Sequence, residues 1–274
     1  MTIRITTVAC LLIAAGSLAA CAGAPVDGGG PVALTSAQDR SRAGDDASVR
    51  VRLAAASYAA GNVSAAVRLY REVTEREPQN GAAWLGLGDA LVKMRSWDEA
   101  ANAYERAAKA SPRSSAPHIG LGRLYLQMQQ PKPAMDRFTE AVALDPNDVK
   151  AHNGRGVALD LLGRHDEAAA EYQKVLAVKP GDRNASNNLA LSLALAGQAS
   201  EAVQRLERMA QAADTPPRIR QNLALALGLS GDTRRARSVA SFDLTPAEIT
   251  ANERFVQTVR PLLLRRGAGD DGAS

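Results

Sequence analysis

Four prolines, Pro78, Pro112, Pro146 and Pro180, follow one another along the chain at a constant interval of 34 residues. The chain has only 13 prolines in 274 residues, so chance does not explain this register. A fixed period of about 20 to 50 residues is typical of arrays in which each unit buries its apolar face only by stacking on its neighbours. The spacing therefore predicts a solenoid of repeated units.

Alignment on these prolines divides residues 47–240 into six repeats. Their ranges are 47–80, 81–114, 115–148, 149–182, 183–216 and 217–240. The eighth place of each repeat is Gly or Ala and the twentieth place is Ala, which lets two helices approach closely. The twenty-fourth place is large in five repeats and fills the adjoining space: Tyr70, Tyr104, Phe138, Tyr172 and Leu206. We therefore expect each repeat to be a pair of packed helices.

The composition agrees with an all-α fold. Hydrophobic residues make up 46% of the chain and aromatic residues only 4%, which favours helices rich in Ala and Leu over sheets of β-branched and aromatic residues. The second helix of a repeat opens with acids such as Asp98 and Glu99, which suit the positive end of the helix dipole. The proline near its end then stops it.

The second repeat, GAAWLGLGDALVKMRSWDEAANAYERAAKASPRS, resembles the signature of the tetratricopeptide family. The matching residues are Trp84, Leu87, Gly88, Leu91, Ala100, Tyr104, Ala107 and Pro112. This resemblance implies an all-α, right-handed superhelical solenoid with about six helix-turn-helix repeats. It also implies that the protein binds other proteins along a groove on the concave side.

The register weakens toward the end of the array. Asp214 stands where the fifth repeat should have its proline, and Ala240 occupies the bulky place of the sixth. Beyond them, Thr245, Pro246 and Glu248 have the pattern of a helix start, with a Thr cap and an acid three residues later. We expect a capping helix within residues 241–265 and a disordered tail at residues 266–274.

Residues 1–20 have the pattern of a bacterial lipoprotein signal peptide. One early cation, Arg4, precedes an apolar stretch that is too short to span a bilayer comfortably. Leu18, Ala19, Ala20 and Cys21 then resemble the lipobox, which implies cleavage before Cys21 and lipidation of its thiol. The alternative is an ordinary signal peptide that leaves Cys21 as a free thiol.

The residues that follow Cys21 predict where the protein lies and how it is attached. Ala22 stands after the lipidated residue, and in such lipoproteins this implies sorting to the outer membrane, with the body facing the periplasm. Residues 21–46 are rich in Gly, Ala, Pro and Asp and have no sustained helical period. We therefore expect them to form a flexible tether.

The sequence offers no residues for catalysis or for a cofactor. No nucleophile motif, phosphate-binding loop or metal-ligand spacing is present, and we interpret His118 and His152 as fillers of a packing position. Without its signal peptide the chain keeps a single cysteine, so no internal disulfide is expected. A formal net charge of +4 without a basic run gives no reason to expect nucleic acid. We expect neither an enzyme nor a small-molecule substrate.

In tetratricopeptide proteins the second, fifth, ninth and twelfth places of the first helix line the groove. The candidate partner-binding residues at and beside these places are Leu85, Asp89, Ile119, Arg123, Asn153, Val157, Asn187, Asn188, Gln221 and Asn222. The amides among them could hold both the N–H and the C=O of an extended peptide. An equal alternative is that they form a solvated polar face without a partner.

The fifth and sixth repeats contain NASNNLALSLALAG and RIRQNLALALGLSGD, followed by SFDLTPAEITANERF. This combination resembles the TadD lipoproteins of the Flp, or tight-adherence, pilus system. The resemblance implies a role in pilus biogenesis, with pilotin-like support of the outer-membrane secretin and contact with other pilus-assembly components. Two alternatives stay open: a general envelope scaffold for peptidoglycan hydrolases or outer-membrane assembly factors, and a regulatory arm of an enzyme.

Overall fold

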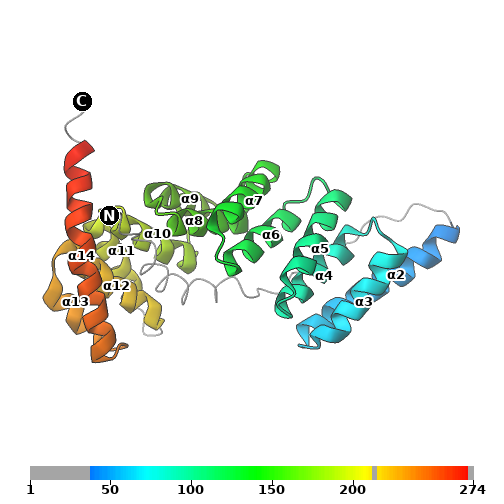
Figure 1. Ribbon diagram of the computed structural model, residues 1–274, viewed down its shortest axis with the longest axis horizontal. Helices are drawn as coiled ribbons and strands as arrows, with labels where there is room; N and C mark the ends of the chain where they lie inside the picture. The colour runs from blue at the N-terminus through cyan, green and yellow to red at the C-terminus, as the bar shows by residue number, and fades with distance from the viewer. Residues whose placement is uncertain (1–37, 212–214, 271–274) are drawn as a thin grey trace. The chain divides into compact units, whose positions relative to one another are not determined.

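The computed structural model describes residues 38–211 and 215–270, with side chains placed for residues 46–211 and 215–265. In these ranges the chain forms thirteen α-helices and no strand (Figure 1). The predicted signal peptide, Cys21 and the first part of the predicted tether lie outside the described residues. The described chain forms two compact units, with the division between residues 151 and 152.

The N-terminal unit contains three complete repeats. Its helices are α2 (Gln38–Ala59), α3 (Val63–Arg76), α4 (Gly81–Lys93), α5 (Trp97–Ala110), α6 (Ala116–Gln127) and α7 (Pro131–Leu144), and it ends in the first residues of α8 (Val149–Leu161). Consecutive helices pack on each other, and the first helices of neighbouring repeats, α2, α4 and α6, also touch. We call the first helix of each repeat helix A and the second helix B.

The C-terminal unit continues the same order of elements. After most of α8 it contains α9 (His165–Val178), α10 (Arg183–Leu195), α11 (Ala199–Ala210), α12 (Pro217–Ser230), α13 (Thr233–Ala240) and α14 (Pro246–Asp270). Helix α14 packs on α12 and α13, as α12 packs on α10 and α11. It therefore occupies the place of a seventh helix A and covers the last repeat (Figure 1).

The turns between helices follow the repeat. Each of the four spaced prolines lies two residues beyond the end of a helix B. Helix A often begins with a side-chain cap: Asn80 Oδ1 accepts the N–H of Ala83 at 3.0 Å, and Asp182 Oδ1 accepts the N–H of Ala185 at 3.0 Å. The short turns between helix A and helix B use left-handed residues, such as Gly163 with φ of 75°.

The core of a repeat is one large side chain of helix B enclosed by small residues. The Tyr104 ring lies so close to Gly88 and Gly120 that a Cβ at either position would come within 2.6 Å of it. Gly88 belongs to helix A of the same repeat and Gly120 to helix A of the next. We call the space bounded by these three helices the slot of the repeat. The small residues of helix A and the large side chain of helix B therefore pack together as one unit.

Two boundaries differ from the sequence-based expectation. Helix α2 begins at Gln38, inside the predicted tether at residues 21–46, and α14 runs to Asp270, into the predicted tail at residues 266–274. The prediction required an apolar period, which the sequence of these two helical segments lacks. Further along α2, Asp46 pairs with Arg50 one turn later at 3.1 Å, a contact that supports a helix.

Helix α14 begins where the Thr245, Pro246 and Glu248 pattern predicts. The backbone N–H of Thr245 donates to Glu248 Oε2 at 2.8 Å, and the N–H of Glu248 donates back to Thr245 Oγ1 at 3.4 Å. This reciprocal pair is a capping box. None of the described helices has the length and apolar character needed to span a bilayer.

Candidate functional site

The predicted groove residues of the N-terminal unit lie on α4 and α6, and they differ in exposure. Leu85 is half-buried and packs against the core, while Ile119 is only 7% exposed. Asp89 and Arg123 are half-buried. Leu85, Asp89 and Arg123 therefore keep some accessible surface on this face, whereas Ile119 keeps little.

Asp89 is the centre of a small charge cluster on this face. Its Oδ1 accepts a hydrogen bond of 2.7 Å from the Tyr104 hydroxyl, so it fixes the ring that fills the slot. Burial raises the pKa of Asp89, although Tyr104 and the positive charges of Arg123 and Lys150 oppose the rise. Asp89, Arg123 and Lys150 come from three successive A helices. The structure thus brings together two predicted site residues, Asp89 and Arg123, with a lysine.

The predicted amides of the C-terminal unit are joined to one another. Asn222 Nδ2 on α12 donates to Asn187 Oδ1 on α10 at 2.9 Å, and Asn187 Nδ2 donates to Asn188 Oδ1 at 3.4 Å. Arg218 and Asn184 make a second side-chain bond between the same two helices. Asn187 is only 5% exposed. Its amide therefore ties two A helices together and has little surface left for a partner.

Three other amides keep accessible surface on helix A. Asn153, Asn188 and Gln221 are half-buried, as is the neighbouring Val157. The Oδ1 atom of Asn153 is buried and has no hydrogen-bond partner among the described residues. A buried acceptor without a donor costs about 1 to 3 kcal/mol.

The C-terminal unit also holds two buried polar networks that the sequence analysis did not predict. In the first, Glu171 pairs with His152 Nδ1 at 2.6 Å, Arg155 at 2.7 Å and Lys174 at 2.9 Å. Burial opposes ionisation of Glu171, but these hydrogen bonds outweigh it and lower its pKa to about 2. His152 is therefore a packing residue, as predicted, that also holds a carboxylate.

The second network surrounds Asp160. Its carboxylate contacts His165 Nδ1 at 2.9 Å and accepts the hydroxyls of Ser192 at 2.8 Å and Tyr172 at 3.0 Å. Burial raises the pKa of Asp160. Both Ser192 and His165 bond the carboxylate, so the histidine does not stand between serine and aspartate as in a nucleophilic relay. This network fixes the Tyr172 ring in its slot, just as Asp89 fixes Tyr104.

Residue types at repeat positions indicate only part of these networks. The histidines and acids stand at repeat positions, but their partners lie 3 to 32 residues away in the chain. Only the packed helices show which acid meets which base. No set of three or more His, Cys, Asp or Glu side chains in the described ranges is arranged to hold a metal ion.

Comparison with known proteins agrees with this architecture. Residues 13–253 match the model of the cilia and flagella-associated protein 70 C-terminal domain, a tetratricopeptide-repeat family. No curated protein sequence matches the chain significantly.

Three solved structures illustrate the likeness of fold. The Pseudomonas aeruginosa pilF structure has a TM-score of 0.64 at 17% identity, over 76% of this chain and 96% of that one. The MamA structure has a TM-score of 0.53 at 21% identity, over 74% and 98%. The YrrB structure, described as having an unusual peptide-binding site, has a TM-score of 0.50 at 22% identity, over 70% and 90%.

At these identities the solved structures establish the fold and nothing more specific. The fold, the repeat register and the family match all indicate the tetratricopeptide-repeat architecture. Proteins of this kind in general serve as protein-binding scaffolds. The chain belongs to the tetratricopeptide-repeat family described as the cilia and flagella-associated protein 70 C-terminal domain.

Proposed function

We propose that this protein is a non-catalytic scaffold that binds an extended peptide segment of another protein along the A helices. The observation that carries the proposal is the set of accessible amides on α8, α10 and α12. The side-chain amides of Asn and Gln can accept the N–H and donate to the C=O of an extended peptide. The printed description of YrrB, a structure of similar fold, also names a peptide-binding site.

We further propose that the scaffold is an outer-membrane lipoprotein that supports biogenesis of the Flp, or tight-adherence, pilus. The support for this comes from the sequence: the lipobox ending in Cys21 and the likeness of residues 184–255 to TadD lipoproteins. The partner would then be the secretin or another pilus-assembly component. Anchoring raises the local concentration of the groove at the membrane, so that weak contacts suffice.

The peptide-binding step can be tested with a triple variant, Asn153→Ala, Asn188→Ala and Gln221→Ala. A matched control is Gln173→Ala with Gln204→Ala, because these two exposed amides lie on the B helices α9 and α11. The readout is co-purification of the secretin, with affinity for its purified periplasmic region. Each lost amide contact is worth about 1 kcal/mol, so the triple variant should bind at least tenfold more weakly.

The control should bind the secretin as the unaltered chain does. Equal loss in both variants, or no binding by the unaltered chain, would contradict the proposal. The cellular role is tested by a deletion strain and by Cys21→Ser, both of which should lose secretin multimers and piliation. Normal piliation in the deletion strain, with hydrolases or outer-membrane assembly factors captured by the groove, would favour the general envelope scaffold.

A further inference from the structure

One face of α2, the first helix A, exposes apolar residues at places that the later repeats bury. The third, seventh and tenth places of the first repeat are Val49, Leu53 and Ala56. A spacing of four and then three residues sets them on one side of the helix. Val49 is 49% exposed and Leu53 is 53% exposed, and Ala56 is exposed as well. We call these three residues the α2 stripe.

The same three places are buried in the five later repeats, apart from the half-buried Arg155 at one of them. Their residues are otherwise at most 6% exposed. These buried residues are Ala83, Leu87 and Ala90; Pro117, Leu121 and Leu124; Ala151 and Ala158; Ala185, Leu189 and Ser192; and Ile219, Leu223 and Ala226. The α2 stripe therefore has the residue types of an interior surface in an exposed position.

Contacts within the N-terminal unit show what covers these places in an interior repeat. Helix α4 packs on α2 and α3, and α6 packs on α4 and α5. At the sixth place, on the same side of helix A, Gly86 and Gly120 lie against Tyr70 and Tyr104 of the preceding repeat. This side of helix A thus faces the repeat before it. Within the described residues no helix precedes α2, so nothing in that part of the chain covers the α2 stripe.

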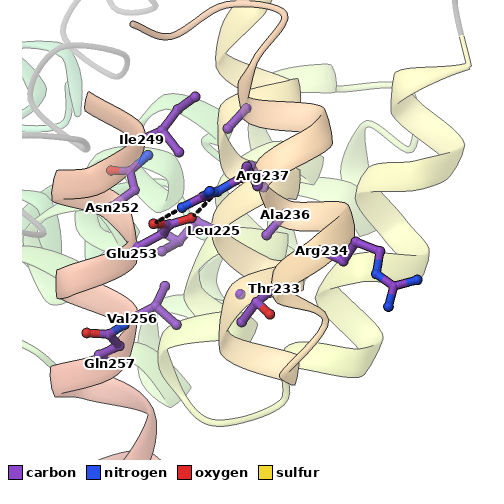
Figure 2. A pocket seen from close by; sticks show the side chains of 13 residues that line it. Leu225, Thr233, Arg234, Ala236, Arg237, Ile249, Asn252, Glu253, Val256 and Gln257 are labelled. Carbon is purple, nitrogen blue, oxygen red and sulfur yellow. Dashed lines mark hydrogen bonds and ion pairs between the residues drawn. The ribbon is translucent and has the colours of Figure 1, made fainter. Parts of the chain in front are cut away.

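The C-terminal end of the array is closed in a different way. Helix α14 packs on α12 and α13, and Arg237 of α13 donates two hydrogen bonds of 2.7 Å to Glu253 of α14 (Figure 2). Thr250, Arg254 and Thr258, spaced by four residues along another side of α14, are exposed and polar. A polar outer face is what a terminal cap of a repeat array requires. The first helix lacks such a face.

The sixth place of the first repeat does not suit the ordinary cover. In the N-terminal unit, Gly86 and Gly120 leave room at this place for the ring of the preceding repeat. The first repeat has Arg52 there, and its side chain is exposed. A long side chain fills the recess that a ring would enter, so a further unit of the same kind does not stack on α2 as the repeats stack on each other. A single helix packed along the stripe needs no recess.

The length of α2 also favours pairing with another helix. It has 22 residues, whereas α4, α6, α8, α10 and α12 have 12 to 14. Exposed charges on and beside the stripe are of both signs, since Asp46 and Arg52 are both exposed. Two such faces do not repel each other as two surfaces of one sign do. The face is therefore compatible with a second copy of itself.

We propose that the α2 stripe is an interface between two copies of this chain, which pair along their α2 helices about a two-fold axis. A two-fold pair sets the same surface of each copy against the other, so each stripe covers its partner and the association closes at two. A pair of single helices is a small interface, and we expect a dissociation constant in the micromolar range. The groove amides lie on other helices, so this inference does not depend on the peptide groove.

The test is the mass of the purified full chain by analytical ultracentrifugation, over a concentration series from micromolar upward. The mass should rise from that of one chain to that of two and stop there. Leu53→Glu should remain monomeric, because it would place a charge in each stripe. The milder Leu53→Ala should weaken the dimer at least tenfold, because each dimer loses two leucine side chains. Amide hydrogen exchange in α2 should slow as the unaltered chain dimerises.

The matched control is Met94→Glu, because Met94 is 49% exposed in the same unit but lies at the end of α4, away from the stripe. It should dimerise as the unaltered chain does, and all variants should keep their helicity by circular dichroism. A mass of one chain throughout the series would overturn the proposal, even if the stripe then captured another protein. So would a dimer that both Leu53 variants leave intact, or a mass that grows beyond two chains.

Discussion

The slot of the second repeat and the slot of the sixth occupy the same architectural position but are filled in opposite ways. In the second, Tyr104 enters between Gly88 and Gly120, and its hydroxyl is held by Asp89 at 2.7 Å. In the sixth, Ala240 and Val256 are among the residues that line a cleft of about 440 Å³ (Figure 2). An interior slot is covered by the following repeat, whereas the last slot has only α14 beside it.

This difference suggests where the array tolerates change. A void inside the stack would remove packing contacts from two neighbouring repeats at once, because their interfaces carry much of the stability. At the end of the stack the same void affects one repeat and one capping helix. In the last repeat, a position that fills the core of the other repeats can therefore serve for binding without loss of the fold.

The largest expected effect is that of emptying the second slot. Tyr104→Ala should lower the free energy of unfolding by about 3 to 5 kcal/mol, because a buried ring is lost and a cavity remains. It also removes the hydrogen-bond donor of Asp89. Urea unfolding followed by circular dichroism measures the change. Phe242→Ala is the control and should stay within about 0.5 kcal/mol, since that side chain is exposed. Equal losses would contradict the account.

The slot of the fourth repeat, which Tyr172 fills, tests how far the stability of a filled slot depends on the polar residues beside it. The pKa of Glu171 is lowered to about 2 from an ordinary 4.5, so its ion pairs contribute about 3 kcal/mol that is present above pH 4.5. This contribution should be lost as the pH falls from about 4.5 toward 2. Glu171→Gln should therefore be much less stable than the unaltered chain at pH 7.

The measurement is urea unfolding of both proteins at pH 7 and at several values down to pH 2.5. The stability difference between them should shrink steadily below pH 4.5. A difference that stays constant over this range would show that Glu171 acts by packing alone.

A smaller effect is expected from overfilling the second slot. Gly120→Ala places a Cβ about 2.5 Å from the Tyr104 ring, so a buried ring must shift, at a cost of about 1 to 3 kcal/mol. Gly181→Ala is the matched control, because a Cβ there meets nothing within 4 Å. Thermal unfolding should separate the two variants by several degrees. Equal midpoints would show that the slot is not tightly packed.

The smallest effect should have the opposite sign. Ala240→Leu fills part of the last cleft and should stabilise the protein by about 0.5 to 2 kcal/mol, the usual gain from cavity filling. The same urea unfolding experiment measures it. A clear destabilisation would mean that the cleft between α13 and α14 is not open in solution.

The repeat architecture could be predicted from the sequence because its determinants recur every 34 residues. The slot residues, the caps and the start of α14 all follow from residue types at fixed places. The helical extensions at Gln38 and Asp270 could not be predicted in this way, because they lack an apolar period. Without an apolar period, the sequence signal that remains is helix propensity, which is weak.

The groove positions are assigned from the repeat register, which does not reveal their contacts. The structure places Asp89 near Arg123. The pairing of Asn187 with Asn222 was not predictable, because it depends on how α10 and α12 pack. The cleft followed a recognisable irregularity, Ala240 at a bulky place. Its size depends on Val256, which lies on a helix outside the repeat pattern.

The most direct test of the central claim, that this protein works by holding another protein on its A helices, is site-specific photo-crosslinking in cells. A photoreactive residue is placed at Gln221 on α12 and, in a parallel strain, at the exposed Gln173 on helix B α9. The account predicts a discrete crosslinked species from position 221, absent from position 173 and identified by mass spectrometry as one protein. Crosslinks of equal yield and pattern from both positions, or none from position 221, would contradict it.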